Sequence, residues 1–207
     1  MKVLMINGSP HADGCTFRAL SEIAKALKED GVDSEIVQIG NGAIHGCIGC
    51  GSCGKLGHCV FTDGPLCETV EKAKEADGLI VGSPVYYASP NGSILSFMDR
   101  LFCSGGKYLA YKPAAAIASA RRAGTTATLD ALNKYFMFNR MPVVSSNYWN
   151  MVHGTCAADV EQDLEGLQIM RGLGHNMAWM LKCIEAGKEK GIECPEGEAK
   201  IKTNFIR

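Results

Sequence analysis

Apolar and polar positions alternate along the chain in blocks that favour strands and helices in turn. Residues 2–7 and 78–82 are short and almost wholly apolar, as expected of strands buried on both faces. Residues 17–29 instead repeat apolar side chains at helical spacing, and Gly31 should close that helix. The first part of the chain is therefore predicted to form strand and helix units in succession.

The same alternation continues towards the C-terminus. Further strands are expected at residues 34–39, 113–119 and 141–146, further helices at 67–76, 92–102 and 125–138, an amphipathic stretch at 159–189, and a frayed tail from Gly187 onward. Apolar strands that alternate with helices predict a parallel sheet covered on both faces. We therefore predict an α/β fold with a doubly wound, five-stranded parallel sheet, whose ligands bind at the carboxyl ends of the strands.

Residues 40–62 are rich in Gly and Cys and have no clear period. A loop of this length inside a compact domain is usually functional. Because we find no linker, internal repeat or low-complexity tract, we expect a single domain over residues 1–207. It should carry a Cys-rich loop at about residues 40–62 and a C-terminal helical region from about residue 159.

Composition narrows the possible functions. Of the 207 residues, 46% are hydrophobic and 21% are charged, and the formal net charge is −1. A net charge this close to zero gives no excess of positive charge for binding nucleic acid, and it disfavours a strongly acidic electron shuttle. No signal peptide and no apolar run of membrane-spanning length is recognisable, which favours a soluble cytoplasmic protein without a membrane partner. In that compartment the ten cysteines are not expected to form disulfides.

The first of three notable loops, residues 8–16, follows the first predicted strand and has the sequence GSPHADGCT. Such a loop offers backbone N–H groups, hydroxyls and a helix N-terminus to an anion. It lacks the lysine of a Walker A loop and the glycine spacing of a Rossmann loop. It could hold a phosphate, or it could be a plain turn capped by Asp13 or Thr16.

The second loop, residues 83–92, contains two prolines that fix its turn and two tyrosines that could flank a planar ring. It could equally be a rigid surface turn. Because successive side chains of an extended stretch point to opposite sides, Tyr86 and Tyr87 should differ in role. The third loop, residues 119–126, follows the fourth predicted strand and includes two arginines, which in the simplest interpretation are solvated beside a helix cap.

Together these loops resemble those of the NADPH-dependent FMN reductase family of flavodoxin-like proteins, over roughly residues 1–150. The resemblance implies a flavodoxin-like fold, FMN as cofactor, NAD(P)H as electron donor, and a flavin, quinone or other small molecule as acceptor. It also implies a homodimer or higher homo-oligomer. No catalytic side chain is expected because the cofactor carries the chemistry.

The resemblance also implies a set of FMN contacts. The phosphate would meet Ser9, Gly14, Cys15 and Thr16; the ring would meet Pro84, Val85, Tyr86, Tyr87, Ser89, Ser119, Ala120 and Gly124. The third loop departs from the commoner run of glycines, since Arg121 and Arg122 replace part of it and could meet a nicotinamide-cofactor phosphate. We expect FMN rather than FAD because no dinucleotide fingerprint is present.

Four cysteines of the Cys-rich loop have the spacing C-x₂-C-x₂-C-x₅-C: Cys47, Cys50, Cys53 and Cys59. Thiolates at this spacing can bind a [4Fe-4S] cluster, and the motif resembles that of iron–sulfur flavoproteins, which act in this alternative as electron carriers for protein partners. Free thiols, a redox disulfide, and a zinc site with His58 as an alternative ligand are also open. The remaining cysteines of the later chain are most simply packing or surface residues: Cys67, Cys103, Cys156, Cys183 and Cys194.

Overall fold

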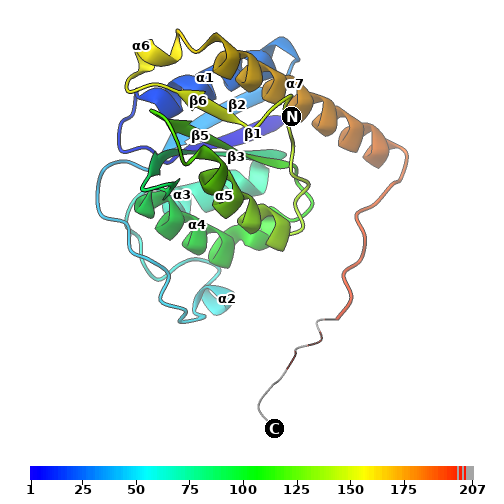
Figure 1. Ribbon diagram of the computed structural model, residues 1–207. Helices are drawn as coiled ribbons and strands as arrows, with labels where there is room; N and C mark the ends of the chain where they lie inside the picture. Colours follow the sequence, from blue (N-terminus) through cyan, green and yellow to red (C-terminus); the bar gives the residue numbers. More distant parts are fainter. Residues whose placement is uncertain (200, 202, 204–207) are drawn as a thin grey trace.

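A parallel β-sheet forms the centre of the computed structural model, which describes residues 1–199, 201 and 203 (Figure 1). The strands are β1 (Lys2–Asn7), β2 (Asp33–Gln38), β3 (Gly78–Tyr86), β4 (Ser89–Pro90), β5 (Ala114–Ala120) and β6 (Met151–His153). Their spatial order is β2-β1-β3-β5-β6, and β4 pairs antiparallel with β3. This is the strand order of flavodoxin-like sheets, so the predicted fold class is confirmed.

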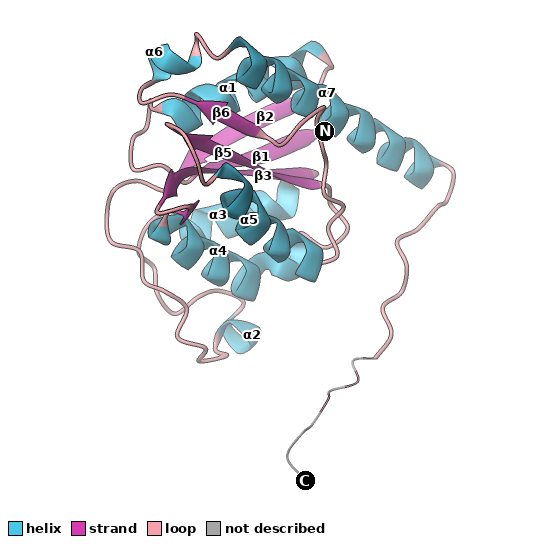
Figure 2. Ribbon diagram, viewed as in Figure 1, coloured by secondary structure: helices cyan, strands magenta, loops and turns pink. Residues whose placement is uncertain are grey.

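Helices cover both faces of the sheet (Figure 2). One face carries α1 (Cys15–Glu29), α6 (Ala157–Val160) and α7 (Leu164–Glu189); the other carries α3 (Leu66–Glu75), α4 (Gly92–Gly105), the 3₁₀ helix η1 (Gly106–Tyr108) and α5 (Thr125–Phe138). The one-turn helix α2 (Cys53–Leu56) lies in the Cys-rich loop, away from the sheet. Within the described residues no helix is both long and apolar enough to cross a membrane.

Alternate side chains of β1 enter two separate cores. Leu4 and Ile6 pack with residues of α3, α4 and α5, whereas Val3 and Met5 pack with residues of α1 and α7. All four side chains are fully buried. Because successive side chains of a strand point to opposite faces of the sheet, a strand buried on both faces has the continuous apolar run seen in the sequence.

The position expected for the fifth strand is wrong. Within residues 141–146 only Val143 forms a bridge, to Ala114, and the strand β6 lies instead at Met151–His153. Pro142 has no N–H group for a ladder, which weakens pairing at this point. The chain then leaves the sheet and rejoins it later.

A side-chain turn explains this excursion. The Ser146 hydroxyl lies 2.8 Å from the Tyr148 carbonyl oxygen and 2.7 Å from Asn150 Oδ1. Such local bonds compete with a strand ladder. Pairing resumes where the Ala118 N–H donates to the Asn150 carbonyl at 2.9 Å.

The amphipathic stretch expected over residues 159–189 is two helices rather than one. Asp163 separates them, because its carboxylate accepts hydrogen bonds from the N–H of Gly166 at 2.9 Å and of His153 at 2.6 Å. An aspartate in this position is a helix N-cap, so α7 begins anew after it. The tail expected from Gly187 begins later, since α7 continues to Glu189; residues 200, 202 and 204–207 of that tail lie outside the described residues.

Candidate functional site

Four loops meet at the carboxyl ends of β1, β3, β5 and β6 and enclose a cavity of about 620 Å³. Of the predicted contacts, its lining includes Ser9, Gly14, Cys15, Thr16, Pro84, Val85, Tyr86, Ser119 and Ala120. Tyr87, Ser89 and Gly124 are not in the lining. The lining also includes His11, Asp13 and residues 154–158, which the sequence did not predict as contacts. The role of all these residues as FMN contacts stays a prediction.

Buried polar side chains from neighbouring elements hold the first loop. The Asn7 side chain accepts from the Ser9 N–H at 3.1 Å, and the Asn91 side chain donates to the Gly8 carbonyl at 3.0 Å. From β2, Gln38 donates to the Ser9 carbonyl at 2.6 Å. These bonds to the loop backbone fix its shape independently of a ligand.

The first loop also approaches β3 closely. The Gly8 N–H donates to the Gly82 carbonyl at 2.8 Å. A Cβ atom on Gly8 would lie 2.7 Å from that oxygen and 2.8 Å from the Cβ of Ile94, which leaves no room for a side chain. The glycine is therefore required by contact rather than by an unusual backbone conformation.

The first turn of α1 opens onto the cavity without a cap. Its N-cap is Gly14, and neither a side-chain cap nor an acidic residue is present in the first turn. The alternative of a plain turn capped by Asp13 or Thr16 is not observed: no side chain caps α1, and the Thr16 hydroxyl bonds to that of Ser119 at 2.8 Å. The amide groups at this helix end and the positive end of its dipole suit a phosphate. The residues present therefore fit the phosphate of FMN.

Two cysteines, Cys15 and Cys156, line the same cavity. Burial raises the pKa of the Cys15 thiol, and the nearby charges of Cys156 and Asp159 raise it further. Cys15 is therefore a neutral thiol near neutral pH and adds no negative charge beside an anion.

The second loop contains a tight hairpin formed by β3 and β4. Tyr87 and Ala88 both have left-handed backbones, with φ of 50° and 58°, so they form a two-residue turn between β3 and β4. Tyr86 lines the cavity and is 46% exposed, whereas Tyr87 is fully exposed. The two neighbouring tyrosines thus face different surroundings.

The third loop packs directly against this hairpin. Gly124 is the N-cap of α5 with φ of 96°, and a Cβ atom there would lie 2.6 Å from the Cα of Ala88 and 2.8 Å from Val85 Cγ1. Gly124 therefore joins two loops of the site to each other. Arg121 of the same loop lines the cavity, while Arg122 does not.

The fourth loop, residues 154–158, is held by Asp159. Its carboxylate accepts from the backbone N–H groups of Thr155 at 2.7 Å and Cys156 at 3.3 Å, and the Thr155 hydroxyl also donates to it. The hydrogen bond from the Thr155 hydroxyl, with those from the Thr155 and Cys156 backbones, lowers the pKa of Asp159. The only sequence signal for this loop is an acidic residue three positions after a helix N-cap, as in a capping box.

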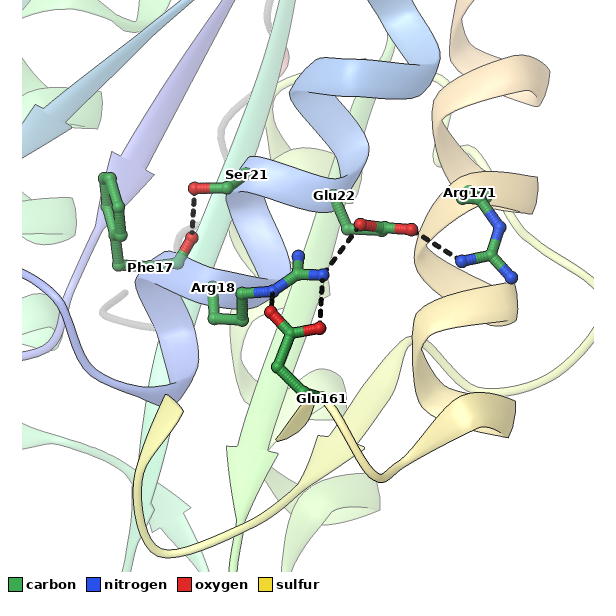
Figure 3. Close-up of polar contacts among 6 residues, drawn as sticks. All are labelled: Phe17, Arg18, Ser21, Glu22, Glu161 and Arg171. Carbon is green, nitrogen blue, oxygen red and sulfur yellow. Dashed lines mark hydrogen bonds and ion pairs between the residues drawn. The ribbon is translucent and has the colours of Figure 1, made fainter. Parts of the chain in front are cut away.

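An ion-pair network connects Glu161, the residue after α6, to helices α1 and α7 (Figure 3). Arg18 of α1 binds the Glu161 carboxylate through two nitrogen atoms, and its Nη2 lies 3.0 Å from Glu22 Oε2. Arg171 of α7 binds the other Glu22 oxygen at 2.5 Å. Burial alone would raise the pKa of Glu22, but hydrogen bonds from Arg171 and Arg18 outweigh it and lower the pKa.

The Cys-rich loop forms a second cavity, of about 230 Å³, against α4. All four predicted thiols line it, and so does Cys103 of α4, which the sequence did not associate with this loop: Cys47, Cys50, Cys53, Cys59 and Cys103. The sulfur atoms of Cys47 and Cys103 are 3.9 Å apart, and the Cys53 thiol donates to the Cys103 carbonyl at 3.3 Å. Burial, together with the hydrogen bond to Cys47, raises the pKa of Cys103 to about 11.

The donor set suits an iron–sulfur cluster. Gly49 and Gly51 have φ of 64° and 68°, which lets the backbone turn around the cavity. Among the described residues no group of three or more His, Cys, Asp or Glu side chains is arranged to hold a metal ion. His58 lies outside this lining, and its Nδ1 bonds to the Cys59 carbonyl at 2.9 Å. Four thiols around one cavity therefore fit a cluster better than a zinc site that uses His58.

The chain is similar to known proteins in both sequence and structure. The family model for NADPH-dependent FMN reductases matches residues 1–155. An iron-sulfur flavoprotein of Methanocaldococcus jannaschii is 33% identical over 193 residues, covering 89% of this chain and 100% of the relative. An iron-sulfur flavoprotein of Methanosarcina thermophila is 26% identical over 194 residues, covering 92% and 100%. The structure of a flavodoxin from the domain Archaea, at 16% identity and a TM-score of 0.62, covers 88% of this chain and 99% of that one, and supports the fold.

Proposed function

The chain belongs to the NADPH-dependent FMN reductase family, and on that premise we propose that it is an FMN-dependent NAD(P)H oxidoreductase. Its electrons would pass to a flavin, a quinone or another small acceptor. The observation that carries this proposal is the 620 Å³ cavity formed by four loops at the carboxyl ends of the parallel strands. That is where doubly wound folds bind their ligands. A homodimer or higher homo-oligomer is part of the proposal.

Bound FMN would supply the redox chemistry, and the protein would position it. The uncapped amides of the first turn of α1 would hold the phosphate, with Cys15 kept as a neutral thiol beside them. Pro84, Val85 and Tyr86 would border one side of the ring and Ser119 with Ala120 another. No acid or base is required of these side chains.

Anaerobic reduction of the bound flavin tests this function. The flavin extracted from purified protein should have the mass of FMN, and NADPH or NADH should bleach its visible absorption, with colour restored by a quinone or free flavin. Extraction of FAD alone would contradict the assignment of the phosphate loop. Bound FMN that neither nicotinamide cofactor bleaches would contradict the reductase and leave a carrier.

The Cys-lined cavity favours a second function, that of an iron–sulfur flavoprotein which carries electrons between protein partners. Both relatives described above bear that name, and the four thiols of the motif surround one cavity. Cys47, Cys50, Cys53 and Cys59 would hold the cluster, which would supply one-electron chemistry.

Iron and sulfide analysis after anaerobic purification separates the two functions. About four iron and four sulfide per chain are expected for a four-cysteine cluster. Zinc in their place would refute the cluster. Absence of iron after reconstitution, with flavin reductase activity intact in a Cys50→Ser/Cys53→Ser variant, would leave a plain flavin reductase.

A further inference from the structure

Arg100 is a buried cation beneath the Cys-rich loop. It projects from α4, yet only 1% of its side chain is exposed, and it is among the largest fully buried side chains of the described residues. A guanidinium removed from water is unfavourable unless its charge and its N–H groups find partners. The partners of Arg100 therefore indicate what this residue does.

All of the polar partners of the Arg100 guanidinium belong to the Cys-rich loop and the residues that end it. Nη1 donates to the His45 carbonyl at 3.2 Å and to the Asp63 carboxylate at 2.9 Å, and Nη2 donates to the Phe61 carbonyl at 2.7 Å. Nε donates to the Cys59 sulfur at 3.3 Å. One side chain thus joins the start of the loop, its end and one candidate ligand.

The two ends of the loop are also fastened to each other above Arg100. The Asp63 carboxylate accepts from the His45 N–H at 2.9 Å, and the rings of His45 and Phe61 stack with centroids 4.5 Å apart. The guanidinium lies 5.5 Å from the Phe61 ring centroid, in cation–π contact. These contacts need no metal.

Cys103 lies one turn further along α4 and contacts Cys47 and Cys53. Through Arg100 and Cys103, α4 therefore contacts three of the four candidate thiols. A planar guanidinium can donate in several directions at fixed angles, which a lysine ammonium cannot reproduce. The Cys-rich loop therefore packs on α4 and is held there by side chains of the helix.

We propose that Arg100 is a positioning residue of the metal site: it closes the Cys-rich loop before any cluster binds, and its hydrogen bond to the Cys59 sulfur raises the reduction potential of the cluster. The second part rests on the cluster proposed above. A loop ordered in advance loses less conformational entropy on binding. A hydrogen bond to a ligand sulfur favours the more negative state of a cluster, so it raises the reduction potential.

Hydrogen exchange in the metal-free protein tests the loop. The hydrogen-bonded amides of the loop, those of His45 and of residues 54–57, should exchange roughly tenfold faster or more in Arg100→Gln, because a charged hydrogen-bond donor that orders the loop is lost. Arg100→Lys should recover part of the protection, and β1 and β3 should be unaffected. Arg140→Gln, an exposed arginine at the amino ends of the strands, is the matched control and should exchange as wild type.

Asp63→Asn is a second variant that changes the loop without removing a buried side chain of α4. It should also accelerate exchange of the hydrogen-bonded loop amides. If Arg100→Gln does not fold, this variant still tests whether the ion pair closes the loop. Unchanged exchange in these variants would overturn the proposal. Faster exchange spread evenly over the sheet would show that Arg100 stabilises the whole fold rather than the loop, and would also overturn the proposal.

The reduction potential of the loaded protein tests the contact with sulfur. It should be more negative in Arg100→Gln than in wild type, and less so in Arg100→Lys. An unchanged potential would overturn the proposed effect of this contact on the cluster. Wild-type protein that takes up no iron or sulfide would refute the cluster and with it this effect, whereas the exchange measurement would still support or overturn loop closure by Arg100.

Discussion

Tyr86 and Tyr87 are adjacent in the chain but differ in what surrounds them, since only Tyr86 lines the 620 Å³ cavity at the carboxyl ends of the strands. We expect Tyr86→Ala to weaken FMN binding by about tenfold, because an aromatic contact contributes roughly 0.5–1.5 kcal/mol beyond the area that it buries. Tyr87→Ala is the matched control and should bind FMN as wild type does. Flavin fluorescence titration of the apoprotein measures both. Equal, negligible effects of the two substitutions would remove the hairpin from the site.

Arg121 and Arg122 allow a similar paired test. Arg121 lines the cavity and Arg122 does not. If Arg121 meets the extra phosphate of NADPH, Arg121→Gln should raise the KM for NADPH about tenfold or more, as expected for loss of a charged hydrogen bond, with little change in the KM for NADH. Steady-state kinetics with both cofactors measure this. A parallel rise for both, or the same rise in Arg122→Gln, would argue against that contact.

Gly124 joins the third loop to the hairpin, and any side chain there collides with Ala88 while the backbone is left-handed. Gly124→Ala should lower the free energy of unfolding by about 1–3 kcal/mol through overpacking and backbone strain. Gly92→Ala, at a glycine with open space around it, is the control and should be close to neutral. Urea unfolding measures both variants. A wild-type midpoint for Gly124→Ala would mean that the loops separate without cost.

Cys103 and residues 154–158, which the sequence did not place at these cavities, share one property: their partners come from distant parts of the chain. Cys103 joins the Cys-rich loop only because α4 lies beneath it, and residues 154–158 reach the cavity only because β6 pairs with β5. The loops after β1, β3 and β5 were predictable because strand ends and turn residues mark them locally. Contacts between distant segments leave no comparable local pattern.

At the scale of elements, the buried carboxylate of Glu22 connects α1 to α7. Glu22→Gln should lower the free energy of unfolding near pH 7 by about 1.5–3 kcal/mol, as expected for charged hydrogen bonds. Because the fold lowers the pKa of Glu22 from 4.5, the stabilisation is present above that value and is lost as pH falls through the lower pKa of the folded state. The difference between variant and wild type should therefore shrink below about pH 4.5.

Urea unfolding between pH 3 and 7 measures this dependence. Glu29→Gln, an exposed carboxylate of the same helix, is the control and should unfold as wild type across the range. A difference between Glu22→Gln and wild type that stays constant with pH would show that packing rather than charge is responsible.

The elements differ in how well their sequences predict them. β1, β3 and β5 are buried on both faces, so each leaves an uninterrupted apolar run. β6 has only three residues and follows a loop that starts near a proline, so no periodic signal is available. The boundary between α6 and α7 depends on Asp163, whose carboxylate is shared with the backbone of His153. Such a boundary is set by tertiary structure.

At the scale of the whole molecule, the four loops that would hold FMN come from most of the sheet, so ligand binding should stabilise the entire fold. FMN at about 100 times its Kd should add about 2.7 kcal/mol to the free energy of unfolding and raise the Tm accordingly. Riboflavin, which lacks the phosphate, should raise the Tm far less. Thermal unfolding of the apoprotein with each compound measures this. Equal stabilisation by both would argue against the first turn of α1 as a phosphate site.

A single rigid helix fixes the spacing between the two cavities. Asn91 at the start of α4 bonds the Gly8 carbonyl of the first loop, and Arg100 reaches the Cys-rich loop about 14 Å further along the helix axis. One residue inserted between them would rotate Arg100 by about 100° relative to Asn91 and detach it from the loop. Insertions are therefore expected to be tolerated within the Cys-rich loop before Ile44, but not within α4. The length of this helix, more than the length of the loop, limits how the chain can vary while it keeps both cavities.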